Sequence, residues 1–160
     1  MPVIHRLMLS DEAATARLAA TLAPQLRPGD ALLLEGPLGA GKTSFARALI
    51  RALAGAGTEV PSPTFNLVLT YDTPAGTLWH FDLYRVADPR ELDELGLEDA
   101  LADGISLIEW PDRLAAGMVP QALTLRITPQ PGTSTAREAE LSGNADWAER
   151  LKDMDHTAND

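Results

Sequence analysis

A glycine-rich loop between an expected strand and an expected helix constrains the fold of this chain more than any other feature. The loop, GPLGAGKTS (36–44), fits the pattern G-x-x-x-x-G-K-S/T. It follows ALLLEG (31–36), a continuous apolar run typical of a strand that is buried on both faces of a parallel sheet. It leads into TSFARALIRALAG (43–55), whose apolar residues recur at four-residue spacing, as on one face of a helix. This order of strand, loop and helix predicts an α/β domain with a P-loop NTPase fold.

The residue types in the loop suit the phosphates of a nucleotide. Glycines let backbone N–H groups close around the β-phosphate, and the helix N-terminus adds partial positive charge there. Lys42 would reach the β- and γ-phosphate oxygens, and Thr43 would ligate Mg²⁺ through its hydroxyl. The sequence has no N/T-K-x-D motif, which reads the base in GTP sites, so ATP is the expected nucleotide. The predicted nucleotide-binding residues of the loop are Gly39, Ala40, Gly41, Lys42, Thr43 and Ser44.

The remaining apolar stretches predict a single domain with a central, mostly parallel sheet, an antiparallel part and helices on both faces. Further strands are expected at 65–71, 77–84, 105–110, 122–128 and 136–143, with helical segments at 10–26 and 88–104. The stretch DTPAG joins the first two of these strands as a hairpin, and the last two are candidates for pairing with each other. We expect a P-loop ATPase domain over 1–145 and a polar tail over 146–160 that is a short helix or disordered.

Two of the expected strands end in an acidic residue. LWHFDLYR delivers Asp82, and ISLIEW delivers Glu109. Magnesium bound to a nucleotide usually takes a second protein oxygen from a strand beside the P-loop strand, so one acid would hold the metal and the other would orient the attacking water. Two alternatives stay open: Glu109 as a surface carboxylate past a strand, and Asp82 as a structural carboxylate paired with Arg85 or His80. His80 itself is expected to be a satisfied buried histidine.

Three further segments are candidates for contact with the nucleotide. In PSPTF (61–65) prolines fix the backbone on either side of Ser62, and Thr64 would approach the γ-phosphate or the metal. A rigid turn without a ligand explains PSPTF equally well. In EWPDR, Trp110 is either part of the core or a lid over the site. The N-terminal segment and the strand around Arg137 are candidates for framing the base.

Composition and charge exclude several functional classes. The chain has 160 residues and no cysteine, which excludes disulfides, thiolate catalysis and cysteine-based zinc sites. Its formal net charge is −10, which disfavours autonomous binding to a nucleic-acid backbone. The first residues lack the basic start and apolar run of a signal peptide, and no stretch approaches the ~18 apolar residues that span a bilayer. A cytoplasmic protein without a membrane partner is expected.

The chain resembles the TsaE family, formerly YjeE, in four motifs that occur in order: GPLGAGKTSFAR, VPSPTF, HFDLYR and LIEWPDR. The resemblance runs from about residue 7 to about residue 140. It implies a small Mg²⁺-dependent ATPase that acts with the companion proteins TsaB and TsaD to form the threonylcarbamoyl group on adenosine 37 (t6A37) of tRNAs reading ANN codons. It also implies that hydrolysis is weak in isolation, rises with the partners and serves turnover of the complex, with tRNA reached only through the companions.

The resemblance also assigns roles to residues in the matching motifs. Lys42 would hold phosphate, and Thr43 and Glu109 would ligate Mg²⁺. Asp82 would support hydrolysis, so Asp82 and Lys42 are the expected catalytic residues. Trp110 would line the nucleotide site.

Two alternative functions use the same loop. A P-loop small-molecule kinase would need a lid of arginines around the transferred phosphate, whereas Arg85, Arg90 and Arg113 are scattered among acidic residues. A nucleotide-binding scaffold without catalysis would not need Asp82 and Glu109. The sequence therefore favours the ATPase over both alternatives.

Overall fold

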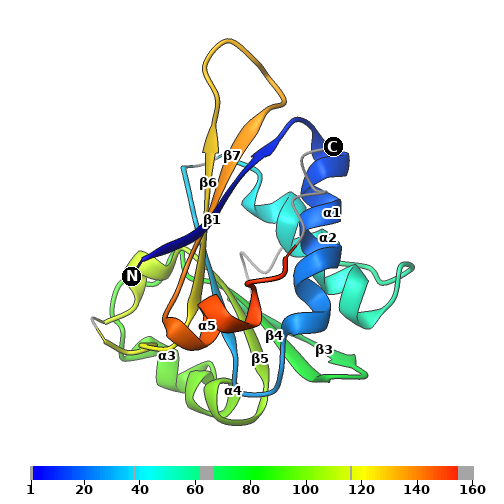
Figure 1. The fold of residues 1–160 in the computed structure, drawn as a ribbon. Helices are drawn as coiled ribbons and strands as arrows, with labels where there is room; N and C mark the ends of the chain where they lie inside the picture. The colour runs from blue at the N-terminus through cyan, green and yellow to red at the C-terminus, as the bar shows by residue number, and fades with distance from the viewer. Residues whose placement is uncertain (1, 38, 62–66, 116, 155–160) are drawn as a thin grey trace.

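In the computed structural model, which describes residues 2–37, 39–61, 67–115 and 117–154, one seven-stranded sheet forms the centre of the chain (Figure 1). The strands are β1 (Val3–Leu9), β2 (Ala31–Glu35), β3 (Val68–Thr73), β4 (Gly76–Asp82), β5 (Ile105–Glu109), β6 (Leu123–Pro129) and β7 (Arg137–Ser142). The α-helices are α1 (Glu12–Leu22), α2 (Lys42–Ala54), α3 (Glu91–Glu94), α4 (Leu97–Asp103) and α5 (Ala145–Arg150). Two short 3₁₀ helices, η1 (Ala23–Gln25) and η2 (Pro111–Arg113), follow α1 and β5.

The sheet is parallel at its centre and antiparallel at both sides. The strand order is β1-β7-β6-β2-β5-β4-β3. The four strands from β6 to β4 are parallel, whereas β7 runs antiparallel to β6, β1 to β7, and β3 to β4. Strands covered on both faces favour apolar side chains, which is why β2 and β5 read ALLLE and ISLIE, with Ser106 and the terminal glutamates as exceptions. The predicted α/β fold with a mostly parallel sheet is confirmed.

Helices cover both faces of the sheet and bury two groups of apolar side chains. On one face α1, α2 and α5 pack on the larger core, to which they contribute Leu18, Phe45 and Trp147. On the other face α3 and α4 pack on a smaller core through Leu92 and Leu97. None of the helices that the described residues form combines the length and the apolar character that crossing a membrane requires.

The structure differs from the sequence-based expectation at the N-terminus. The strand β1 was not among the predicted elements, because VIHRLML mixes His5 and Arg6 with apolar residues and β1 pairs with β7 alone. The helix after it is capped by Asp11, whose carboxylate accepts a hydrogen bond from the Ala14 N–H. The other predicted elements are present, and 88–104 forms the two helices α3 and α4, which Gly96 separates.

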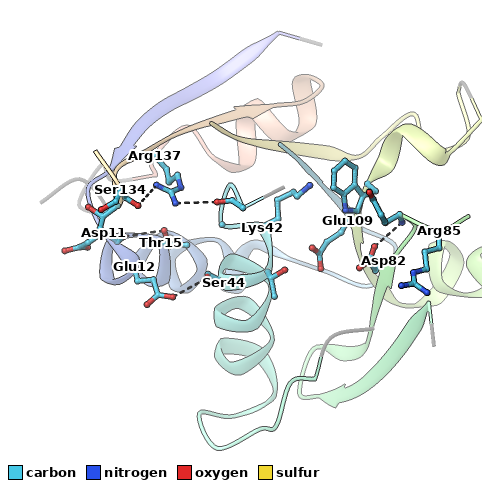
Figure 2. A pocket seen from close by; sticks show the side chains of 16 residues that line it. Asp11, Glu12, Thr15, Lys42, Ser44, Asp82, Arg85, Glu109, Ser134 and Arg137 are labelled. Carbon is cyan, nitrogen blue, oxygen red and sulfur yellow. Dashed lines mark hydrogen bonds between the residues drawn. The ribbon is translucent and has the colours of Figure 1, made fainter. Parts of the chain in front are cut away.

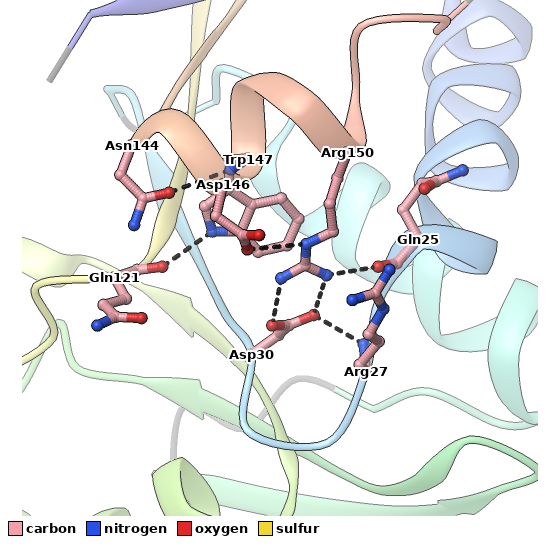
Figure 3. A network of polar contacts seen from close by, with 8 residues as sticks. All are labelled: Gln25, Arg27, Asp30, Gln121, Asn144, Asp146, Trp147 and Arg150. Carbon is pink, nitrogen blue, oxygen red and sulfur yellow. Dashed lines mark hydrogen bonds and ion pairs between the residues drawn. The ribbon is translucent and has the colours of Figure 1, made fainter.

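The helix α5 is fastened to the larger core by a largely buried ion pair (Figure 3). Arg150 donates two hydrogen bonds, of 2.7 and 2.8 Å, to the carboxylate of Asp30 and a third, of 2.8 Å, to the Gln25 carbonyl oxygen. Its guanidinium also lies 3.8 Å from the centroid of the Trp147 ring, and Trp147 and Leu151 are fully buried. The division of the chain at residue 145 stays a prediction, but these contacts join α5 to the sheet domain.

Breaking this ion pair is expected to destabilise the fold. The Arg150 and Asp30 side chains are only 9% and 13% exposed. We expect Arg150→Ala to lower the free energy of unfolding by about 3 kcal/mol, because Asp30 would keep a buried charge without its partner. Lys152→Ala removes the exposed pair with Glu149 and should change stability by less than about 0.5 kcal/mol. Urea unfolding measures both, and equal small effects would show that Asp30 is adequately solvated without Arg150.

Candidate functional site

The glycine-rich loop joins β2 to α2 through backbone that glycine adopts readily. Gly36, directly after β2, has φ 148°, and a Cβ built there would lie 2.4 Å from the Ile127 carbonyl oxygen on β6. Gly41, which precedes α2, has φ 107°. The chain therefore passes close against β6 and enters the first turn of α2, whose unpaired N–H groups suit anionic phosphates.

Lys42 lies in the first turn of α2 and is almost fully buried. Its ammonium donates a hydrogen bond of 2.5 Å to the Gly36 carbonyl oxygen and lies 3.4 Å from the centroid of the Trp110 ring. Burial lowers the pKa of Lys42, and the negative charge of Glu109 is the largest influence that opposes this shift. The cation is thus held at the loop by a carbonyl and an aromatic face.

Asp82 and Glu109 lie beside each other because β4 and β5 are parallel neighbours. Asp82 is opposite Glu109 in the register of these strands, and Glu109 is opposite Leu34 near the end of β2. The carboxyl ends of all three strands therefore meet at the edge of the sheet where the loop begins. Asp82 is 9% and Glu109 3% exposed, so the alternative of Glu109 as a surface carboxylate is wrong. Asp82 Oδ1 accepts a hydrogen bond of 3.0 Å from the Tyr84 N–H.

His80 forms its hydrogen bond with Glu109. The distance between His80 Nε2 and Glu109 Oε2 is 2.6 Å, and the two side chains are 2% and 4% exposed. Among the described residues the other ring nitrogen, Nδ1, has no hydrogen-bond partner. His80 is buried as expected, and the alternative in which it pairs with Asp82 is wrong.

Arg137 connects β7 to the glycine-rich loop. Its Nε donates a hydrogen bond of 2.9 Å to the Ala40 carbonyl oxygen, and Nη2 donates one of 3.5 Å to that of Gly39. Nη1 donates to the carbonyl oxygens of Ser134 and Ala136. The guanidinium therefore ties the loop to the β6–β7 connection, although almost one hundred residues separate the two in the sequence.

One cavity of about 730 Å³ lies at the carboxyl end of the parallel strands (Figure 2). Lys42, Asp82, Glu109 and Arg137 line it, whereas His80 does not. Of the residues predicted from the sequence, the cavity is lined by Gly39, Gly41, Lys42, Thr43, Ser44, Asp82, Glu109, Trp110 and Arg137. Ala40 is fully buried and does not line it. Thr64 lies outside the described residues. The structure thus brings most of the predicted residues together, while their individual roles stay predictions.

Part of the cavity wall comes from residues that the sequence did not single out for this role. They are Asp11, Glu12, Thr15, Tyr84, Arg85, Ser134 and Thr135. Glu12 accepts a hydrogen bond of 3.2 Å from Ser44 Oγ, which links the start of α1 to that of α2 (Figure 2). Tyr84 and Arg85 belong to the motif HFDLYR and follow β4, although no role at the site was assigned to them. No motif marks the other five, because they reach the cavity through the packing of α1 on α2 and the pairing of β6 with β7. For these five the only signal was the expectation that the N-terminal segment and the strand around Arg137 frame the base.

A comparison with protein families identifies the chain. The profile of the family described as "Threonylcarbamoyl adenosine biosynthesis protein TsaE" matches residues 9–139. The chain belongs to the TsaE family. The resemblance inferred from the four motifs is therefore confirmed, and the region matched to TsaE includes every residue that lines the cavity.

Similar proteins carry the same family name. The chain is 44% identical over 121 residues to the tRNA threonylcarbamoyladenosine biosynthesis protein TsaE of Rickettsia felis, which covers 76% of this chain and 71% of the relative. It is 47% identical over 105 residues to the protein of that name from Rickettsia bellii. This alignment covers 66% of this chain and 73% of the relative. Among solved structures, Bacillus subtilis YdiB superposes with a TM-score of 0.74 at 26% identity, covering 95% of this chain and 94% of YdiB.

The close approach of Gly36 to β6 predicts a steric effect of a side chain at this position. In Gly36→Ala the Cβ would clash with the Ile127 carbonyl oxygen at a φ that alanine rarely adopts. We expect the free energy of unfolding to fall by about 2 kcal/mol or more. Gly57→Ala is the matched control, because a Cβ there meets nothing within 4 Å. If thermal and urea unfolding showed the two variants to be equally stable, the backbone at Gly36 would be less constrained than its geometry implies.

Proposed function

We propose that this chain is a Mg²⁺-dependent ATPase that supports formation of t6A37 in tRNAs reading ANN codons, together with TsaB and TsaD. The observation that carries the proposal is the cavity, where a P-loop, a buried lysine and two buried carboxylates meet in a chain of the TsaE family. Relatives at 44% and 47% identity are named for tRNA threonylcarbamoyladenosine biosynthesis, which supports the assignment of this pathway.

The loop and Lys42 bind the phosphates of ATP. Backbone N–H groups in the first turn of α2 face the anionic groups, and Lys42 adds a full positive charge beside them. Arg137 keeps the loop in shape through its bonds to the carbonyl oxygens of Gly39 and Ala40.

Thr43 and Glu109 are suited to hold Mg²⁺. Their donor atoms are a hydroxyl and a carboxylate, the hard oxygen ligands that Mg²⁺ prefers, and both residues line the cavity. Mg²⁺ usually binds through one or two protein groups together with nucleotide phosphates, and this donor set fits that pattern. When bound, the metal would neutralise charge that develops on the β- and γ-phosphate oxygens.

Asp82 orients the water that attacks the γ-phosphate. It is buried at the end of β4, and the hydrogen bond from the Tyr84 N–H holds its Oδ1. The aromatic side chains of Tyr84 and Trp110, whose ring centroids are 4.9 Å apart, lie at the same cavity and restrict the entry of other water molecules. A carboxylate at this place accepts a proton or a hydrogen bond from the attacking water.

The partners supply the contact with tRNA. With a net charge of −10, this chain repels a phosphate backbone, so the companion proteins would carry the RNA. We propose that hydrolysis is slow in the isolated chain and rises when TsaB and TsaD are present. ATP would then be spent on turnover of the complex, and not on the bond that forms the product.

A small-molecule kinase is not favoured. Arg90, one of the arginines that such a lid would use, is highly exposed and donates hydrogen bonds to its neighbour Asp88. Arg85 and Arg137 both line the cavity, but Arg137 donates hydrogen bonds to carbonyl oxygens of the loop. Arg85 alone does not make a lid that encloses a transferred phosphate.

Substitutions in the loop should separate phosphate binding from metal binding. Lys42→Ala is expected to weaken binding of a fluorescent ATP analogue at least tenfold with or without Mg²⁺, because it removes a charge from the phosphates. Thr43→Ala should mainly remove the gain in affinity that Mg²⁺ provides. Thr21→Ala, at a half-buried threonine of α1 that does not line the cavity, is the control for loss of a hydroxyl. If Lys42→Ala and Thr43→Ala lowered affinity for the ATP analogue by the same factor, both with and without Mg²⁺, these roles would be contradicted.

Asp82→Asn should separate binding from hydrolysis. We expect ATP affinity within a few-fold of the parent and a hydrolysis rate lower by roughly 10²-fold, the scale expected for a group that positions or deprotonates water. In a t6A time course with limiting TsaB and TsaD, this variant should stop multiple rounds of modification, whereas Asp72→Asn on the exposed side of β3 should not. If Asp82→Asn hydrolysed ATP at the parental rate, Asp82 would have only a structural role. Full t6A turnover without ATP hydrolysis would refute the proposed function.

A further inference from the structure

His80 is a buried side chain that the proposed mechanism leaves without a role. It lies on β4 opposite Leu107 of β5 and is 1% exposed. Alternation along the strands places it on the same face as Asp82 and Glu109, the face that carries the larger core. Its neighbours two residues away on β4 and directly across on β5 are Leu78 and Leu107, both fully buried. An apolar residue would therefore suit this position, and a histidine there needs a reason.

The hydrogen bond to Glu109 specifies how the imidazole is protonated. A carboxylate only accepts hydrogen bonds, so His80 Nε2 must donate the bond of 2.6 Å to Glu109 Oε2. Nδ1 is buried and, among the residues that the structure describes, has no partner. A proton on Nδ1 would be an unsatisfied buried donor, so the hydrogen-bond geometry favours the tautomer that carries its hydrogen on Nε2.

This bond restricts a side chain that would otherwise have several orientations. Glu109 reaches the cavity from the end of β5, and a carboxylate with no partner rotates about its last torsion. Since His80 holds Oε2, the other oxygen, Oε1, is the one left for a ligand in the cavity. Removing a group that holds a metal-binding side chain in this way typically lowers the affinity for the metal by about 10–100-fold.

We propose that His80 is a positioning residue that holds Glu109 through Nε2–H so that the carboxylate presents Oε1 to the Mg²⁺ of the bound nucleotide. The inference rests on the proposed role of Glu109 as a metal ligand. It assigns His80 a function in metal affinity that is separate from its contribution to the core.

A matched pair of substitutions tests the position of the donor. The side-chain nitrogen of His80→Gln reaches about as far as Nε2, whereas that of His80→Asn reaches only as far as Nδ1 and falls short of Glu109. Both place an amide in the core, so their general cost to stability is similar. Leu78→Val perturbs the same face of β4 without touching this bond and serves as the packing control.

The measurement is the affinity of the ATP-bound protein for Mn²⁺, a spectroscopic substitute for Mg²⁺, by electron paramagnetic resonance, together with ATP affinity in the absence of metal. We expect His80→Asn to weaken Mn²⁺ binding roughly 10–100-fold. The Mn²⁺ affinity of His80→Gln should stay within a few-fold of that of the parent. Leu78→Val should bind Mn²⁺ as tightly as the parent. Metal-free ATP affinity should be unchanged in all three, a result that a merely structural role would not produce.

Several outcomes would overturn the inference, and one would instead overturn the metal-ligand role of Glu109 on which it rests. Equal Mn²⁺ affinity in His80→Asn and the parent, or equal losses in the Asn and Gln variants, would remove the positioning role. Should neither variant fold, nitrogen NMR of the parent's imidazole decides, because a hydrogen on Nδ1 instead of Nε2 excludes the proposed donor. If Glu109→Gln also binds Mn²⁺ as tightly as the parent, the metal-ligand role of Glu109 fails.

Discussion

The site depends on the parallel pairing of β2, β5 and β4. Parallel neighbours end at the same edge of a sheet, so the loop after β2 and the acids that close β5 and β4 come together without any long side chain reaching across the fold. The apolar residues of β2 and β5 are buried under helices on both faces, and this burial holds the register. A shift by one residue would turn Glu109 and Asp82 to the opposite face, away from α2.

The charged side chains at this edge are buried, and each has a partner. Lys42, Asp82 and Glu109 are each less than 10% exposed, and burial lowers the pKa of Lys42. Isolated charges in such surroundings would be costly, but the lysine has a carbonyl and the Trp110 ring, and each carboxylate has a hydrogen-bond donor. Trp110 holds its place with a left-handed backbone, φ 61°, which is uncommon for a bulky residue. Preorganised groups of this kind suit the binding of a highly charged ligand such as a nucleoside triphosphate.

Part of the cavity rim comes from two segments that lie near opposite ends of the sequence. The connection from β1 to α1 supplies Asp11 and Glu12, and β7 supplies Arg137, which holds the loop. These segments meet because β1 pairs with β7, and β7 with β6 next to β2. The antiparallel strands β1 and β7 therefore contribute to the site. They position the residues that support the phosphate loop and close one wall of the cavity.

Much of this was readable from the sequence, because its signals are local. The spacing of Gly36, Gly41, Lys42 and Thr43, the apolar run before them and the helical period after them predict a strand, a phosphate loop and a helix without reference to the rest of the chain. Strands that end in Asp82 and Glu109 were visible in the same way, and the four motifs were enough to indicate the family.

Only the tertiary structure decided which distant groups meet. The bond between His80 and Glu109 depends on the register of β4 against β5, and the clamp of Arg137 on the loop depends on β7 lying next to β6. The strand β1 carries no strong pattern of its own and forms because β7 offers it an edge. Sequence periodicity reports the environment of each segment, whereas pairing between segments is set by the packing energy of the whole fold, which no local stretch contains.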